Sequence, residues 1–598
     1  MPGAVEVEHD RSAVPAEAAR PDHDDGISRR AEPRSPRAAL ALALAPLVVS
    51  AVALAVAVGG DYRPEGDIAI IEMTTRAVGD HWPLVGNHSH DGWHHPGPAL
   101  LYVLALPYRL LGGSSIGLPV GALAINGASV AGMAIVARRR GGVPLMLITL
   151  LGCALVMRSF GPEQLRLPWQ PWVTVFPYGL LVFLTWAMAC GDRWALPVAV
   201  LVGSFAAQTH VGYVALALPL VVLGAAWLFA THRRELTRLL WPSVCALGVA
   251  LLAWLPPLID ELTNEPGNAT LVARWFRNGT INGEGSHTLL EGWRVVSAQY
   301  ALAPEWLAGT RSLVGFDPAP PYVSDPVVPV LLVAVALAVA VLWRRRVPQS
   351  GQLVAVWAGA SVVGVIATSR VIGPLYAYRF GWARMLGMVA GVIVAWAAWR
   401  VVAERRPALE RRVLTPIAVT AIAVLAVVGS VAHVRAGVPQ QSESASISEL
   451  VAPVLAVLPP GDGEVVVEGI DFFGTSYATG LVLQLERHGV DAGQPPTEPR
   501  RPEELHIYSG GPVRAHLTLA LDDDVVDLTT RRDLRLVVLS GGLTLDELRV
   551  AVEASKQLEA IMAGERAVDH GQFDALVQAA TLPRPAVGVF TEAPAAGP

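Results

Sequence analysis

Two carboxylates and a group of histidines share one polar stretch, residues 66–98, with the sequence GDIAIIEMTTRAVGDHWPLVGNHSHDGWHHPGP. Asp67 and Glu72 lie five residues apart, and either could take a proton from a hydroxyl group as a general base. The alternative is structural, because an acidic side chain at the start of a short helix also caps it. Ile68, Ile70 and Ile71 indicate a helix that lies on a membrane surface.

The histidines of this stretch, together with Asp91, offer nitrogen and oxygen atoms that could bind zinc or another divalent ion. Their spacing matches no diagnostic ligand pattern, and such loops also use histidines for hydrogen bonding. We therefore expect no metal cofactor and keep a metal site as the alternative; its ligands would be His88, His90, Asp91 and His94. Substrate contacts are expected from His94 and His95, and from His210, which lies at membrane depth between two apolar runs. The alternative for His210 is a histidine that only ends a helix.

Arginines at the ends of the apolar runs are candidates for binding a lipid phosphate, because the planar guanidinium meets pairs of oxygens and stays charged near lipid. They are Arg158, Arg166, Arg370, Arg379 and Arg384. The segment SRVIGPLYAYRFGWAR (369–384) is favoured, since aromatic residues beside its arginines can form the wall of a pocket. The alternative is an interfacial aromatic belt with snorkelling arginines.

The composition predicts a polytopic α-helical membrane protein. Apolar residues make up 53% of the 598 residues, charged residues only 16%, and the mean hydropathy is +0.44. We predict about eleven transmembrane helices from the apolar runs at 38–59, 115–136, 142–158, 172–190, 194–209, 212–230, 239–258, 325–343, 351–369, 384–402 and 413–432.

The arginine clusters orient these spans. With eleven crossings, the clusters at 29–37, 138–140, 193, 233–238, 344–346 and 400–412 all fall on one side, which the positive-inside rule makes cytoplasmic. The short run 98–113 must then lie in the outer interface and not cross. We expect a cell-membrane protein with its N-terminus inside and its C-terminus outside.

The chain divides into three parts. Residues 1–37 predict a disordered cytoplasmic tail, residues 38–435 the transmembrane module with outer loops 60–114 and 259–324, and residues 436–598 an extracytoplasmic α/β domain. In this domain 463–469 and 533–542 favour strands, whereas 477–490 and 543–565 favour helices. It has no glycine-rich nucleotide-binding turn and no clustered basic surface, so nucleic acid is not expected as a partner.

The start of the chain resembles the GT-C superfamily of membrane glycosyltransferases. The features that match are an Asp just beyond the first span, the segment IAIIEMTTRAVGDHW, the stretch HHPGPALLYVLALPYRLLG and an arginine-rich end of the second span. The resemblance implies Asp67 as catalytic base. Many relatives carry a second acidic residue next to it, whereas this chain has Ile68; Glu72 could substitute, as could Asp61 and Glu65, or one carboxylate suffices.

The resemblance also implies the partners: a polyprenyl-phosphate sugar as donor, an envelope glycan, lipid or protein as acceptor, and the surrounding membrane lipids. Relatives include mannosyltransferases and actinobacterial arabinosyltransferases of cell-wall biogenesis. A base opposite the leaving phosphate would give inversion at the sugar carbon. Two other functions stay open at this stage, a transporter or flippase of a lipid-linked precursor and a noncatalytic envelope scaffold.

Overall fold

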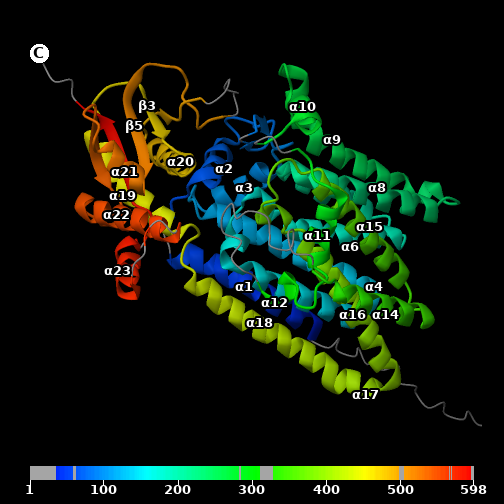
Figure 1. Cartoon of the computed structure of the whole chain (residues 1–598). Helices are drawn as coiled ribbons and strands as arrows, with labels where there is room; N and C mark the ends of the chain where they lie inside the picture. Colours follow the sequence, from blue (N-terminus) through cyan, green and yellow to red (C-terminus); the bar gives the residue numbers. More distant parts are fainter. Residues whose placement is uncertain are drawn as a thin grey trace, which may run out of the picture.

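The computed structural model describes most of the chain, and it shows a bundle of long helices with a smaller sheet-containing domain at one end (Figure 1). The residues described are 35–57, 62–89, 91–281, 285–309, 327–496, 504–563, 566, 569–582 and 584–593. The predicted tail therefore lies almost entirely outside the described residues, as do Asp61, His90 and the end of the loop predicted at 259–324.

The bundle is built from apolar helices, which satisfy their own backbone hydrogen bonds as a lipid environment requires. They are α1 (Ser35–Ala57), α4 (Gly117–Arg166), α6 (Val175–Ala189), α7 (Ala195–Thr209), α8 (Val214–Thr231), α9 (Leu240–Thr263), α14 (Val330–Arg344), α15 (Ser350–Ser369), α16 (Ala383–Arg405) and α18 (Thr415–Arg435). Within the described ranges, eight helical segments are long and apolar enough to cross a membrane, and α7 and α14 are shorter apolar helices. The chain is a multi-pass membrane protein, as predicted.

Helix α4 reverses direction within its length. Its backbone leaves helical geometry at Gly142, where φ is 73° and glycine alone is comfortable. The side-chain amide of Asn126 donates to the carbonyl of Leu165 at 3.1 Å, although 39 residues of straight helix would separate them by about 58 Å. The two arms match the runs predicted at 115–136 and 142–158, while the total of eleven crossings stays a prediction.

The arginine-rich ends of several helices meet at the same end of the bundle. Arg140 pairs with Asp192 at 2.8 Å across the α4–α6 ends, and Arg345 at the end of α14 pairs with Glu404 near the end of α16. The indole of Trp186 reaches the carbonyl of Gln349 at 2.9 Å, which links α6 to the turn before α15. The clusters at 138–140, 344–346 and 400–412 thus lie at the same end of the bundle, and the assignment of that end as cytoplasmic remains a prediction.

The domain at the other end of the bundle carries a five-stranded mixed sheet of order β4-β3-β5-β7-β6, in which β3 pairs parallel with β4 and β5, and β7 pairs antiparallel with β5 and β6. We call it the outer domain, and the end of the bundle beside it the outer end, after the side predicted for them; that side remains a prediction. The strands are β3 (Glu464–Gly469), β4 (Ala492–Gly493), β5 (Val513–Leu521), β6 (Leu534–Leu539) and β7 (Val587–Glu592). The helices are α19 (Gln441–Val457), α20 (Phe472–Arg487), α21 (Asp522–Leu528), α22 (Leu545–Met562) and α23 (His570–Ala580). Strands β3 and β6 and helices α20 and α22 fall where the sequence predicts them.

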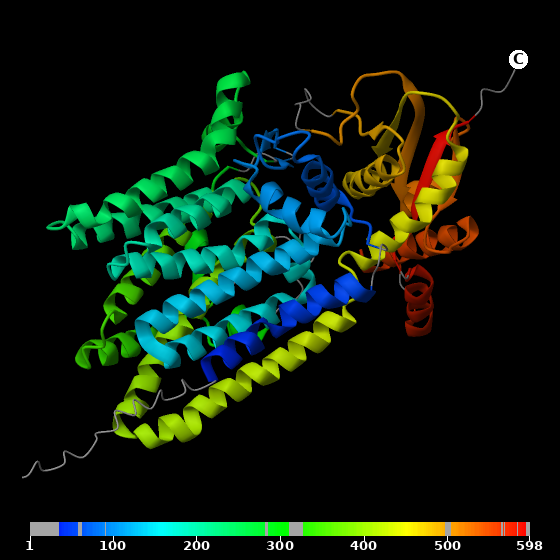
Figure 2. The same ribbon diagram turned by 180° about the vertical axis from the view of Figure 1, so that it is seen from behind.

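Helix α2 (Gly66–Ala77) lies between the bundle and this domain, as Figures 1 and 2 both show. Ile68 and Ile71 are buried in the core of the bundle, whereas Ala69 and Met73 are buried in the core formed by α19, α20 and the sheet. The predicted surface helix is therefore covered on both sides. Next to it, α3 (Ala99–Leu110) packs against α2, α4 and α7. The position predicted for this run, in the outer interface, remains a prediction.

Two ion pairs hold α20 against α2. Glu72 is fully buried and accepts from Nε of Arg487 at 3.0 Å and from the hydroxyl of Tyr108 at 3.3 Å. One helical turn further along α2, Arg76 pairs with Glu486. Because its carboxylate is committed to this contact between domains, we assign Glu72 to positioning α2 and not to the chemistry predicted for it.

Breaking the Glu72–Arg487 pair should loosen the outer domain. Arg487→Ala leaves a buried carboxylate without its charge partner, and we expect it to destabilise the docked arrangement by about 3 kcal/mol. Thermal unfolding in detergent and limited proteolysis between α18 and α19 would measure the loss.

The double variant Glu72→Gln/Arg487→Met should recover most of the stability, because no charge is then left buried. Arg531→Ala, at an exposed ion pair with Asp533, is the control and should leave both measurements unchanged. Unaltered unfolding and cleavage in Arg487→Ala would show that the pair does not hold the domain.

Candidate functional site

Asp67 lies in the first turn of α2, at the outer end of the bundle, and is half-buried. Its Oδ2 accepts a hydrogen bond from the indole of Trp169 at 2.6 Å. Its backbone carbonyl accepts from the side-chain amide of Asn87 at 3.4 Å. An indole donor is neutral, so it holds the carboxylate in place without supplying a countercharge. A carboxylate fixed in this way remains able to accept a proton.

Aromatic rings connect Asp67 to an arginine. The ring of Trp169 lies 4.7 Å from that of Tyr378, and Tyr378 stacks on Tyr376 at 5.8 Å. The guanidinium of Arg379 lies 5.3 Å and 5.6 Å from the centres of the two tyrosine rings. The structure thus brings the first-loop carboxylate and the favoured arginine of 369–384 to the same end of the bundle.

The charge of Arg379 has only neutral partners among the described residues. Its Nε donates to the hydroxyl of Tyr378 at 3.2 Å, and its longer contacts, at 3.4 and 3.5 Å, are to the carbonyls of Ile372 and Pro374. The side chain is half-buried and is held by backbone and aromatic groups. Such an arginine is positioned to attract an anion.

Glu65, the residue that precedes α2, belongs to a polar network at the junction with the outer domain. Its carboxylate accepts from the amide of Gln440 at 3.1 Å, and the backbone of Gln440 donates to Glu163 at 2.9 Å. Burial, together with the charges of Glu443 and Asp67, raises the pKa of Glu65 to about 8. Glu65 is therefore mostly neutral at pH 7 and adds little negative charge beside Asp67.

Two histidines from distant parts of the chain meet near Arg379. The rings of His95 and His210 lie 4.9 Å apart. Burial, assisted by the charge of His88, lowers the pKa of His95 to about 3. Burial, with the charges of His95 and Arg379, holds the pKa of His210 well below its ordinary value. Both rings are neutral at physiological pH.

Hydrogen bonds show which nitrogen of each ring carries the proton. The Nδ1 of His95 accepts from the backbone of Val211 at 3.3 Å, and the Nδ1 of His210 accepts from the backbone of Gly212 at 3.1 Å. A neutral imidazole that accepts at Nδ1 carries its proton on Nε2. Each ring therefore offers one N–H donor, suited to a hydroxyl or a phosphate oxygen.

His94 belongs to a different environment from His95, because successive side chains leave opposite faces of an extended segment. Strand β2 (Trp93–His94) pairs with β1 (His88–Ser89). The side-chain amide of Asn268 donates to the carbonyl of His94 at 2.9 Å and accepts from its N–H at 2.8 Å. Asn268 starts helix α10 (Asn268–Asn278) of the second outer loop.

The ring of His94 contacts the outer domain and not the group around Asp67. Its Nε2 lies 3.5 Å from Oε1 of Glu504, and Nε2 of His88 lies 3.7 Å from the same oxygen. The carboxylate of Asp91 accepts a hydrogen bond from the hydroxyl of Ser89, and His90 is outside the described residues. Among the side chains that the structure describes, no three His, Cys, Asp or Glu residues form a group that could hold a metal ion.

The remaining candidate arginines have other environments. Arg166 is fully buried and donates to Ser50 at 2.8 Å and to the carbonyls of Gly437 and His433, so it ties α4 to α1 and α18. Arg384, also buried, pairs with Glu305 at the start of the short helix α12 (Glu305–Ala308). Arg158 donates to the carbonyl of Leu307, and Arg370, just beyond α15, is exposed. We keep Arg379 alone for the anion.

Trp169 and Tyr378 are the site residues that the sequence analysis did not single out. Trp169 lies in LRLPWQPW (165–172), a proline-rich outer segment, and Tyr378 is one of the aromatic residues beside Arg379. In the sequence they stand out only as part of two polar segments rich in aromatic residues. Such segments indicate an interfacial aromatic belt as readily as a binding site. Contact with Asp67 distinguishes the two, and that contact requires the fold.

The depressed pKa values of His95 and His210 predict a pH-dependent stability. Both rings bind a proton on unfolding below about pH 6.5, so the free energy of unfolding should fall as pH drops through that value. Glu65 acts in the opposite direction, because its carboxyl must ionise on unfolding between pH 4.5 and 8. Thermal unfolding of wild type and His95→Gln between pH 7.5 and 5 would isolate one ring.

We expect wild type to lose up to about 1.4 kcal/mol more per pH unit than His95→Gln below pH 6.5. Glutamine can still accept from Val211, and Glu65 contributes equally to both proteins. Parallel stability curves would refute a neutral, buried His95.

The comparisons with known proteins support the fold. No protein-family model and no curated protein sequence matches the chain. Among solved structures it is similar to ArnT from Cupriavidus metallidurans bound to undecaprenyl phosphate, with 14% identity and a TM-score of 0.50 over 82% of this chain and 94% of that one. An oligosaccharyltransferase of Archaeoglobus fulgidus, solved with zinc and sulfate, aligns at 11% identity and a TM-score of 0.45 over 92% of this chain and 88% of that one. The chain therefore has the fold of ArnT, in agreement with the resemblance described in the sequence analysis.

Proposed function

We propose that the chain is an extracytoplasmic glycosyltransferase, which moves a sugar from a polyprenyl-phosphate donor to a hydroxyl of a cell-envelope acceptor. The observation that carries the proposal is the position of Asp67, held by Trp169 at the outer end of a GT-C bundle and connected through aromatic rings to Arg379. The solved structure of ArnT contains undecaprenyl phosphate, which supports a lipid phosphate as the donor group.

The mechanism follows from the charges of these residues. Asp67 takes the proton of the acceptor hydroxyl as its oxygen attacks the sugar carbon, and the bond from that carbon to the phosphate oxygen breaks. The negative charge that develops on the departing phosphate faces the guanidinium of Arg379. A base on the side opposite the leaving group gives inversion. The N–H groups of His95 and His210 are available to hydroxyl or phosphate oxygens.

We propose no metal cofactor for this step, because Arg379 supplies a fixed positive charge of the kind that a cation would otherwise bring to the phosphate. Transfer of radiolabelled sugar from the lipid donor should therefore proceed at an unchanged rate after divalent metal ions have been chelated. Loss of transfer after chelation, with recovery on adding a divalent ion, would instead favour the metal alternative.

The first test is removal of the base. Asp67→Asn keeps the shape and can still accept the Trp169 hydrogen bond, but it cannot take a proton. We expect the turnover rate to fall by about 10²- to 10⁴-fold, measured as radiolabel moved from a panel of polyprenyl-phosphate sugars to envelope acceptors by the purified protein.

Asp80→Asn, at an exposed carboxylate just beyond α2, is the matched control and should transfer normally. Full activity in Asp67→Asn would remove the base from the proposal. Donor that is bound but never consumed by wild type would contradict the enzyme itself and favour a transporter or a scaffold.

The second test concerns the phosphate. Arg379→Gln removes the charge beside the site, and we expect the KM for the lipid donor to rise about 10- to 100-fold, as for loss of a hydrogen bond between charged groups. Arg370→Gln removes an exposed arginine of the same segment and should have little effect. Equal effects of the two substitutions would mean that the segment contributes only general positive potential.

A further inference from the structure

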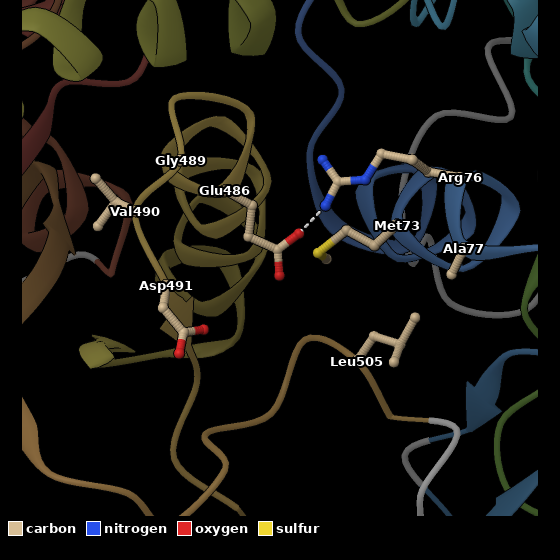
Figure 3. Close-up of a pocket in the computed structure, with 8 residues that line it drawn as sticks. All are labelled: Met73, Arg76, Ala77, Glu486, Gly489, Val490, Asp491 and Leu505. Atoms are coloured by element: carbon tan, nitrogen blue, oxygen red, sulfur yellow. Dashed lines mark hydrogen bonds and ion pairs between the residues drawn. The ribbon is translucent and has the colours of Figure 1, made fainter. Parts of the chain in front are cut away.

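A pocket of about 380 Å³ lies between α2 and the outer domain, on the side of α2 that faces α20 (Figure 3). Met73, Arg76 and Ala77 of α2 form one wall, and the opposite wall comes from the end of α20, the start of the following segment and Leu505. None of these residues belongs to the group around Asp67. The side chain of Arg76 is about one-third exposed, so solvent reaches the pocket.

The lining combines hydrogen-bonding groups of both kinds with apolar surface. Arg76 offers N–H donors, and Glu486 and Asp491 offer carboxylate oxygens; Figure 3 shows Arg76 and Glu486 paired across the pocket. Met73, Val490 and Leu505 add apolar contacts.

This combination selects among ligand classes. A lipid tail would leave the charged groups unsatisfied. An anion would meet two carboxylates and one arginine that is already paired. A saccharide fits both features, because each hydroxyl donates and accepts and the ring carries apolar C–H faces.

The pocket is separated from Asp67 by the helix itself. Nine residues from Asp67 to Arg76 span about 14 Å along α2, and the two side chains lie on opposite faces, since nine steps of about 100° make two and a half turns. A ligand in the pocket therefore leaves Asp67 accessible. It also lies on the outer domain, at the side of the bundle where the proposed acceptor would approach.

We propose that this pocket anchors a neutral glycan chain of the acceptor at a distance from the hydroxyl that reacts. The inference rests on the proposed function, because it gives the acceptor its chemical class. Anchoring adds affinity for a longer acceptor without touching the reacting groups, so it should lower the KM for glycan chains and leave the turnover rate unchanged.

Two variants test the pocket while leaving the Arg76–Glu486 and Glu72–Arg487 pairs intact. Ala77→Phe fills the space. Asp491→Ala removes a carboxylate that can accept hydrogen bonds, and it keeps the backbone carbonyl of residue 491, which accepts from the N–H of Val465. Asp462→Ala removes a carboxylate from an exposed turn of the same domain and is the control. Binding of purified full-length protein is measured on an array of neutral hexose and pentose oligosaccharides, their monosaccharides and unrelated peptides.

We expect wild type and Asp462→Ala to bind one or more oligosaccharides and both pocket variants to bind them about tenfold more weakly. In transfer assays the pocket variants should raise the KM for the oligosaccharide acceptor by a similar factor and leave its turnover rate, and transfer to the monosaccharide, unchanged.

The array result stands apart from catalysis. Oligosaccharide binding that the pocket variants lose supports the site even if no sugar is transferred, in which case only the proposed function fails. If the two pocket variants transfer sugar normally, and their oligosaccharide binding and KM match those of wild type, the proposed glycan site is wrong and the proposed enzymatic function stands. Binding of peptides in place of glycans, or of none of the array, also overturns it.

Discussion

The placement of Asp67 depends on the burial of α2 between two hydrophobic cores. A helix of twelve residues is marginal by itself in water, yet this one buries Ile68 and Ile71 in the bundle and Ala69 and Met73 in the outer domain. Gly66 permits the close approach of α20, since its φ of 53° suits glycine and a Cβ there would lie 3.0 Å from Oγ of Ser476. The outer domain is therefore part of the scaffold of the site, because without it one side of the helix that carries the carboxylate would be exposed.

Around Asp67 the structure separates charge in a manner suited to transfer from a phosphate. One guanidinium keeps its charge beside neutral aromatic and backbone partners, and two imidazoles are neutral with their protons on Nε2. Glu65 is mostly neutral as well, so it adds little negative charge beside Asp67. With Asp67 as the proposed proton acceptor and Arg379 as the proposed cation, the site would need few ionisable groups, and each additional charge near lipid is costly to bury.

The sequence predicted the membrane module and the α/β domain, because these depend on hydropathy and local periodicity. It also offered Asp67 and Arg379 as site residues, and their roles remain predictions. It did not separate Asp67 from Glu72, which have the same chemistry and lie in the same helix. Their difference arises from Arg487, more than 400 residues away, and local sequence carries no trace of such a pairing. The same holds for Arg166, whose hydrogen-bond partners, Ser50 of α1 and the carbonyls of His433 and Gly437 at the end of α18, lie far from it in the sequence. His94 and His95 were predicted together, and the alternation of an extended segment sends their rings to different neighbours.

The pairing of Asn268 with the His94 peptide group has a consequence for producing the protein. Asn268-Ala269-Thr270 is an Asn-x-Thr acceptor sequence for N-linked glycosylation, but in the folded chain Asn268 is 2% exposed and both ends of its amide are hydrogen-bonded. A secretory host that modifies asparagine before folding is complete would place a bulky sugar where the two outer loops join. Bacterial expression avoids that modification and keeps the joint between the loops closed.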